Sequence, residues 1–152
     1  MKSKLEGGQL PFFAYGTLLP GQRNFFVWGG AIIAQEQAVL ANGRLIDLGS
    51  YPMLLEEGEA TIQGMLLTVA PAKYMTVLSR LDILEGFDPT RPTEPGYRRV
   101  MRQVRGQQGC WHTAWVYIGQ GIRRDDLPTI PNGDWASYAA QKWPLFRGAS
   151  QK

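Results

Sequence analysis

One segment of the chain repeats apolar residues at helical spacing, between Pro71 and Gly86. Its apolar stripe falls on one face of a helix and consists of Tyr74, Leu78, Leu81 and Leu84. Proline suits the first turn because its missing N–H would have no helical partner there. Glycine is favoured just beyond a helix C-terminus. The pattern therefore predicts one main helix that begins at Pro71 and stops at Gly86.

Shorter segments rich in β-branched and aromatic residues are typical of strands. They comprise residues 11–15, 38–48, 51–55, 61–69, 97–104 and 110–118. The last two are joined by a glycine-bounded turn, residues 106–109, and predict an antiparallel pair. Alternation along the first strand of this pair predicts a shared face for Arg98, Val100 and Arg102.

Two connections in this pattern need comment. Asn42-Gly43, inside residues 38–48, favours a hairpin turn but also fits a bulge in one long strand, and both alternatives stay open. Residues 51–55 and 61–69 are predicted to be two strands, joined by a solvated acidic loop that contains Glu56, Glu57 and Glu59.

Three further segments complete the expected architecture. Residues 24–28 predict a short helix, and the prolines of residues 88–96 predict a loop. Residues 119–152 predict in part a short packed helix, carried by Trp135, Tyr138, Trp143 and Phe146. Strands with one strong helix and hairpins indicate an α+β fold. We expect a mostly antiparallel, barrel-like sheet with one main helix and short additional helices.

Composition narrows the class of protein. The 152 residues are 44% hydrophobic and 11% aromatic, which suits a single domain over residues 1–152. We expect an ordered core of about residues 12–146 and mobile ends. A net charge of +3, without a concentrated basic stripe, does not indicate a nucleic-acid-binding protein. One cysteine, Cys110, leaves no internal disulfide, and this fits a cytoplasmic location. The longest apolar run, residues 25–34, is too short to span a membrane, and no export signal is evident.

Glu85 is the first candidate for chemistry because it falls on the last turn of the predicted helix. The final carbonyl groups of a helix carry partial negative charge, so a carboxyl there is expected to hold its proton more tightly. Asp82 lies one turn earlier and is expected to raise the pKa of Glu85 further. A raised pKa suits a general base near neutral pH. The alternatives are a solubilising role for Glu85 and, for Asp82, a solvent-facing side chain or a partner for Arg80 or a strand arginine.

The second candidate is Tyr15-Gly16-Thr17-Leu18, at the end of the first predicted strand. Glycine there lets the backbone approach a ligand closely and aim successive N–H groups at an anion. Such a loop can serve as an oxyanion hole, and its alternative is an ordinary tight turn.

Other chemistries find little support. His112 is the only histidine, and Cys110 lies two residues from it on the same face of a predicted strand. Neither a histidine-based metal site nor a cysteine nucleophile with an independent base is expected. Walker and dinucleotide-binding glycine patterns do not occur. We therefore expect no nucleotide cofactor.

An ordered set of motifs resembles the gamma-glutamyl cyclotransferase-like family. The motifs are Phe13–Leu18, Gly49–Pro52, Leu81–Gly86, Tyr97–Arg99 and Ala114–Tyr117. The resemblance spans about residues 12–117, with weaker similarity at residues 133–135. It implies an antiparallel, barrel-like α+β fold without a metal or organic cofactor. The Thr17-Leu18 form and Tyr51-Pro52 look closer to the branch that acts on gamma-glutamylamines, whereas the proline-rich 88–96 insertion leaves the leaving group open.

The resemblance implies a small-molecule gamma-glutamyl substrate that cyclises to 5-oxoproline and releases an amine or amino acid. It implies that Glu85 is the catalytic acid/base and that the Tyr15–Leu18 loop cradles the substrate. Tyr97 and Tyr117 are expected as pocket walls or simply as core residues, and Arg98 or backbone N–H groups as ligands of the substrate α-carboxylate. No nucleic-acid or membrane partner is expected, and the oligomeric state stays open.

Two other functions remain as alternatives at this stage. One is a non-catalytic binder of small anionic gamma-glutamyl-like metabolites. The other starts from the basic residues and predicts association with nucleic acid or anionic lipid, which would weaken with salt.

Overall fold

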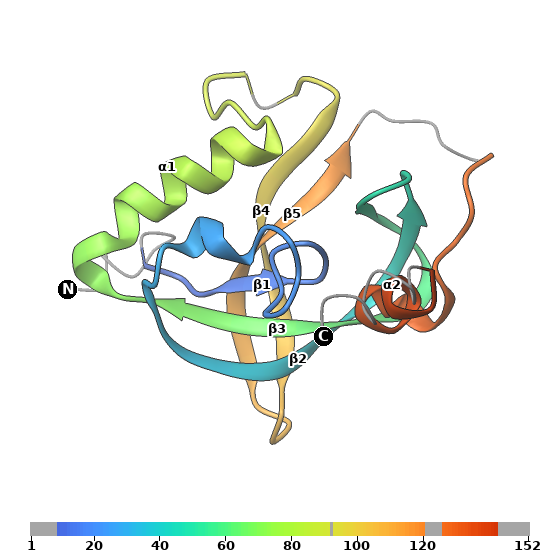
Figure 1. The fold of residues 1–152 in the computed structure, drawn as a ribbon, viewed down its shortest axis with the longest axis horizontal. Coiled ribbons are helices and arrows are strands. Elements are labelled where there is room, and N and C mark those ends of the chain that lie inside the picture. The colour runs from blue at the N-terminus through green and yellow to red at the C-terminus, as the bar shows by residue number, and fades with distance from the viewer. Residues whose placement is uncertain (1–8, 92, 121–125, 143–152) are drawn as a thin grey trace, which may run out of the picture.

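Five strands close into a barrel in the order β1-β3-β2-β4-β5 (Figure 1). The computed structural model describes residues 9–91, 93–120 and 126–142, and its strands are β1 (Phe12–Ala14), β2 (Ile32–Asp47), β3 (Pro52–Val69), β4 (Gly96–Gly106) and β5 (Trp111–Gln120). Neighbouring strands pair antiparallel, except that β1 meets β5 in parallel to close the barrel. The predicted fold class, a mostly antiparallel barrel within an α+β domain, is confirmed.

The main helix lies where the apolar stripe predicts it. A 3-10 turn, η3 (Pro71–Lys73), leads into α1 (Tyr74–Glu85). Gly86 ends α1 in the left-handed region at φ 73°, and its N–H bonds to the carbonyls of Asp82 and Ile83. Because a side chain is strained at this φ, glycine is the residue that fits the stop.

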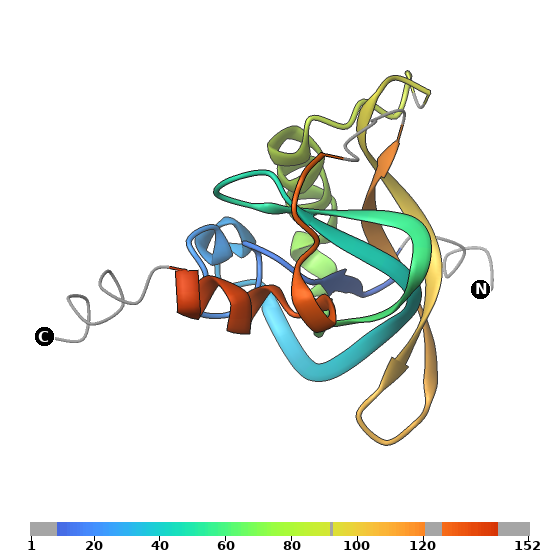
Figure 2. The same ribbon diagram turned by 90° about the vertical axis from the view of Figure 1, so that its right-hand side faces the viewer.

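Besides η3, shorter helical segments accompany α1 in the described part of the chain. They are η2 (Phe25–Trp28), η4 (Pro131–Gly133) and α2 (Trp135–Lys142). The helices predicted for residues 24–28 and for the C-terminal tail are thus confirmed, although Trp143 and Phe146 lie outside the described residues, as do the predicted mobile ends. α1 lies at the left and α2 at the right in Figure 1, and Figure 2 shows α2 on the side that faces the viewer.

The β2–β3 pair corrects one prediction and decides an open one. Asn42-Gly43 is a bulge rather than a hairpin turn, since β2 runs on through it with a register shift between Leu40 and Gly43. Residues 51–55 and 61–69 are not two strands but the two ends of β3. The acidic residues between them leave the ladder without ending the strand, because Gly43 pairs with Ala60 while the next residue, Arg44, pairs with Leu55.

Two large apolar clusters hold the domain together. The first fills the barrel with residues such as Leu45, Leu54 and Ile62, and α2 covers it through Trp135, which is 1% exposed. The second lies between the barrel wall and the α1–η2 layer, where Phe12 and Trp28 pack with one face of α1. Burial of the inner face of α1 therefore fixes where its C-terminal end, and with it Glu85, meets the barrel.

Candidate active site

A cavity of about 430 Å³ opens where β1 ends, beside the C-terminus of α1. Its volume lies in the range of small-molecule sites. The walls come from segments far apart in the sequence: Phe13, Ala14, Tyr15, Gly16, Thr17, Leu18, Arg23, Asn24, Tyr51, Pro52, Leu84, Glu85, Gly86, Tyr97 and Tyr117. The two sequence candidates, the Tyr15–Leu18 loop and Glu85, therefore face the same cavity.

The Tyr15–Leu18 loop is held tightly at the end of β1. The buried Tyr15 hydroxyl donates to the carbonyl of Tyr117 on β5 at 2.6 Å. A Cβ at Gly16 would lie 2.7 Å from Cγ of Pro52, closer than atoms can pack. Glycine at this position lets the loop lie directly against the start of β3.

The loop backbone is oriented by bonds to its carbonyl groups. The carbonyl of Gly16 accepts from the N–H of Leu19 at 3.1 Å, and that of Thr17 from the N–H of Asn24 at 3.0 Å. The two ends of a trans peptide unit point in opposite directions, so the N–H groups of Thr17 and Leu18 face away from those partners. Within the part of the chain that the structure describes, neither N–H donates to another backbone carbonyl. Both belong to residues that line the cavity.

Glu85 is the last residue of α1 and is half-buried at the cavity wall. Burial raises the pKa of its carboxyl to about 7. No side chain among the described residues forms an ion pair or hydrogen bond with it. The expected increase in pKa is present, but its cause is the loss of hydration rather than the neighbouring Asp82.

Asp82 is taken up in a separate network. Arg99 of β4 donates to its two carboxylate oxygens at 2.9 and 3.1 Å, and the Tyr117 hydroxyl donates to Oδ1 at 2.5 Å. Arg99 also stacks on Trp115, with 4.3 Å between its guanidinium carbon and the ring centroid. Of the two alternatives for Asp82, the partner of a strand arginine is confirmed, and the network ties α1 to β4 and β5 one turn before Glu85.

Three tyrosines interact electrostatically with the carboxyl of Glu85. Burial is the main cause that raises the pKa values of Tyr15, Tyr97 and Tyr117, and the charge of Glu85 raises each further. Their hydroxyl groups stay protonated, and each donates within the protein: Tyr97 bonds the carbonyl of Pro52 at 2.6 Å. The tyrosines thus form rigid walls and leave Glu85 as the group in the cavity that titrates near neutral pH.

The cation at the cavity is not the expected one. Arg98 is not among the lining residues; it follows Tyr97 on β4 and therefore points to the opposite face of the sheet. There its charge acts on Glu56, which Arg102 of the same face binds at 2.5 and 2.7 Å. Arg23 lines the cavity instead.

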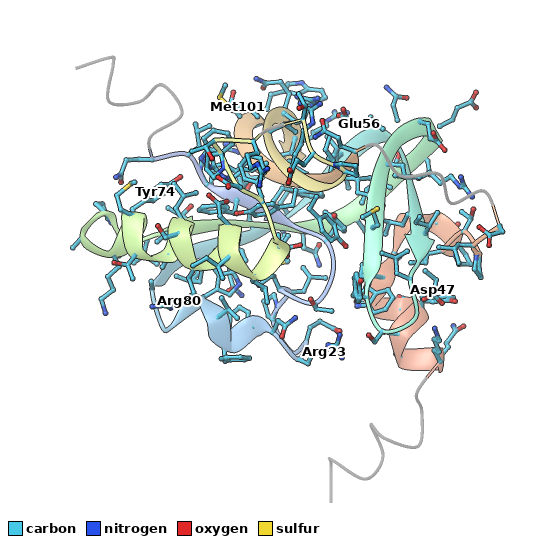
Figure 3. The ribbon with its side chains drawn as sticks, turned by 90° about the horizontal axis from the view of Figure 1, so that it is seen from above. Arg23, Asp47, Glu56, Tyr74, Arg80 and Met101 are labelled. Atoms are coloured by element: carbon cyan, nitrogen blue, oxygen red, sulfur yellow. The ribbon has the colours of Figure 1, made fainter. Side chains whose placement is uncertain are left out.

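Arg23 belongs to the loop between β1 and η2 (Figure 3). Its Nη2 donates to Oγ of Ser50 at 3.2 Å, which bridges that loop and the β2–β3 turn. The next residue, Asn24, donates from Nδ2 to Oγ1 of Thr17 at 3.0 Å. The sequence analysis missed both residues. Only their position a few residues after the Tyr-Gly-Thr-Leu motif could have pointed to them.

The residues with metal-binding side chains do not gather at the cavity. Within residues 9–91, 93–120 and 126–142, no three His, Cys, Asp or Glu side chains are placed to hold a metal ion. Nε2 of His112 lies 3.4 Å from Oε2 of Glu36, and neither residue lines the cavity. Cys110 is exposed. In the same residues, no helix has the length and apolar character needed to cross a membrane.

Comparison with known proteins defines the family. The family model described as "Gamma-glutamyl cyclotransferase, AIG2-like" matches residues 12–137. A Vibrio cholerae protein named "Putative gamma-glutamylcyclotransferase" is 32% identical over 123 residues, which cover 81% of this chain and 92% of the relative. This chain belongs to the gamma-glutamyl cyclotransferase, AIG2-like family, as the motifs of the sequence indicate.

Solved structures share the fold at lower identity. A mouse AIG2-like protein superposes with a TM-score of 0.62 at 23% identity, over 83% of this chain and 88% of that one. YkqA from Bacillus subtilis gives 0.64 at 21% identity over 88% of this chain, which spans only 42% of the YkqA chain. These likenesses support the barrel architecture and do not distinguish branches of the family.

Proposed function

We propose that this protein is a gamma-glutamyl cyclotransferase that converts a gamma-glutamyl amide into 5-oxoproline and a free amine. The observation that carries the proposal is Glu85, a carboxyl with a pKa of about 7 that faces the Tyr15–Leu18 loop across one cavity. Family membership supports the same chemistry.

The reaction needs proton transfer from the attacking nitrogen to the leaving nitrogen and no added reactant. The substrate α-amine attacks the side-chain carbonyl carbon, so that a C–N bond closes a five-membered ring. The original amide C–N bond then breaks. An α-ammonium group has a pKa of about 8 and is no nucleophile until it loses a proton. Glu85 takes that proton as its carboxylate and returns it to the leaving nitrogen. The attacking nitrogen loses a second proton as the ring amide forms, and this proton also passes to the leaving nitrogen, so that the amine departs as an ammonium ion.

The loop would stabilise the charge that develops on the carbonyl oxygen. The N–H groups of Thr17 and Leu18 meet no backbone acceptor in the described protein and belong to residues that line the cavity. Fixed donors of this kind contribute about 3 kcal/mol each to the stability of an oxyanionic transition state. Because the carbonyl groups of the loop are already bonded, these donors are oriented before substrate arrives.

The remaining lining residues suit binding. Arg23 offers its guanidinium to a substrate carboxylate, the role expected of Arg98, and Asn24 lies beside it. Tyr97 and Tyr117 would confine the substrate in the folded shape that ring closure requires, because both hydroxyl groups are anchored to the protein.

The test is direct detection of product. The purified chain is incubated with gamma-glutamyl amino acids, gamma-glutamylamines and glutathione, and 5-oxoproline is measured by mass spectrometry. We expect 5-oxoproline from at least one class, in equal amount to the released amine. Calorimetric binding of these compounds without 5-oxoproline, across a pH range of about 6 to 9 that brackets the Glu85 and amine titrations, would contradict an enzyme and favour the binder of anionic metabolites.

A further inference from the structure

Two large apolar side chains stand almost fully in water close to the cavity. Phe26 of η2 is 75% exposed and Ile83 of α1 is 80% exposed, while Leu84 next to it is 42% exposed. Single exposed apolar residues are common, but clustered ones mark binding surfaces.

These side chains border a second hollow, of about 420 Å³. We call it the leaving-group groove and define it by Phe26, Val27, Arg80, Ile83 and Leu84. Val27 is buried beneath it, and Arg80 crosses from α1 to η2, where its Nη1 donates to the carbonyl of Val27 at 2.8 Å (Figure 3). The groove therefore lies between two elements that Arg80 holds together.

The groove adjoins the catalytic cavity at Leu84. Leu84 lines both hollows, whereas its neighbour Glu85 lines the cavity but not the groove. Under the proposed function, Glu85 returns a proton to the leaving nitrogen, so that nitrogen must lie beside Glu85. A substituent on it then meets Leu84 first and extends along the groove.

We propose that the leaving-group groove binds the amine half of the substrate, and that this half carries an apolar chain with no cationic end. The proposal rests on the proposed function and specifies its substrate class. Apart from Arg80, the lining side chains are hydrocarbon, and they gain from contact with an alkyl or aromatic chain. A chain with a cationic end meets Arg80 and no acidic lining residue, so it is disfavoured.

The test compares amides that differ only in the amine. Gamma-glutamyl methylamide, propylamide and hexylamide lengthen the chain, and the 5-aminopentyl amide matches the hexylamide in length but carries a charge. We expect kcat/KM for 5-oxoproline release to rise at least about 10-fold from methylamide to hexylamide. The aminopentyl amide should lose most of that gain.

Two variants test whether the dependence of kcat/KM on chain length arises in the groove. Phe26→Ser and Ile83→Ser change exposed positions, and each should lower the ratio of hexylamide to methylamide kcat/KM toward one. Met75→Ser is the matched control, because Met75 is 64% exposed on the same helix and lies outside the groove. It should keep the ratio. Circular dichroism checks that all three variants fold.

The two failures are distinguishable. 5-Oxoproline release that does not depend on chain length, or a ratio that Phe26→Ser and Ile83→Ser leave intact, overturns the groove while the enzyme assignment stands. Absence of 5-oxoproline from every amide overturns the proposed function itself, and the groove proposal with it.

Discussion

Asp82 and Glu85 lie one turn apart on α1, yet Arg99 binds Asp82 whereas Glu85 has no cationic partner among the described side chains. The first carboxylate anchors the helix to β4. The carboxyl of Glu85 loses enough hydration on burial for its pKa to reach about 7. Two carboxyl groups placed in different surroundings can thus take different tasks, one in positioning and one in proton transfer.

Glu85→Gln should lower kcat/KM for 5-oxoproline release by about 10² to 10⁴, because glutamine keeps the shape but cannot accept a proton. The matched control is Glu59→Gln, which removes an exposed carboxylate on β3 away from the cavity lining. Steady-state assays of both variants, with circular dichroism spectra, decide the point. Activity of Glu85→Gln within about threefold of the parent would contradict the assignment.

The pH dependence of kcat/KM should have an acidic limb with a midpoint near 7, set by the raised pKa of Glu85. Below that pH the carboxyl is protonated in the free protein and cannot act as a base, so activity falls about tenfold per pH unit. The pKa of the substrate amine, measured separately by NMR titration, separates its contribution. A limb centred near the ordinary glutamate pKa would show that burial does not tune this group.

Stability should change with pH in the direction opposite to that of a salt-bridged acid. The folded protein holds the Glu85 proton up to a pKa of about 7, against 4.5 for an unperturbed glutamate, so it binds more protons than the unfolded chain between these pH values. The free energy of unfolding therefore decreases as the pH rises through this window.

Glu85→Gln removes that term. Denaturant unfolding should show the variant more stable than the parent at pH 8 by about 1 to 3 kcal/mol, with the difference shrinking toward pH 5. A difference that stays constant with pH would argue against the burial of an ionisable group.

Asp82→Asn should destabilise the fold by about 3 kcal/mol, because the buried guanidinium of Arg99 is left without its countercharge. Both side chains of this pair are only 11% exposed. The double variant Asp82→Asn/Arg99→Gln should recover part of the loss, and the coupling is read from a double-mutant cycle of unfolding free energies. Purely additive losses would mean that the pair does not hold α1 against β4.

Arg23→Gln should raise KM about tenfold with a much smaller effect on kcat, because the proposed role of Arg23 is to bind a substrate carboxylate and not to contact the reacting atoms. Added salt should raise KM for the parent and less so for the variant. Arg91→Gln, at an exposed residue outside the cavity lining, serves as the control. An unchanged KM in Arg23→Gln would assign substrate carboxylate binding to backbone groups alone.

Local signals in the sequence were sufficient to predict the main helix and the two segments of the cavity wall that contain Glu85 and Gly16. Helical spacing and Gly86 place Glu85 at a helix terminus, and Gly16 marks a tight bend after a strand, because capping and turn chemistry act over a few neighbouring residues. The strand segments predicted a barrel-like sheet for the same reason. Only β3 was divided wrongly, since a strand that bulges around acidic residues and then resumes looks, locally, like two strands.

Long-range packing decided the rest. Alternation predicted the faces of β4 correctly, but it did not say which face meets the cavity. The sequence predicted Arg98 or backbone N–H groups as ligands of the substrate carboxylate, whereas the structure places Arg23 at the cavity. The pKa of Glu85 was expected to rise for a local reason, the helix end and Asp82, whereas the structure attributes it to burial. Burial and ion pairing depend on residues that are distant in sequence, such as Arg99 and Tyr117 around Asp82, and these meet only when the barrel closes.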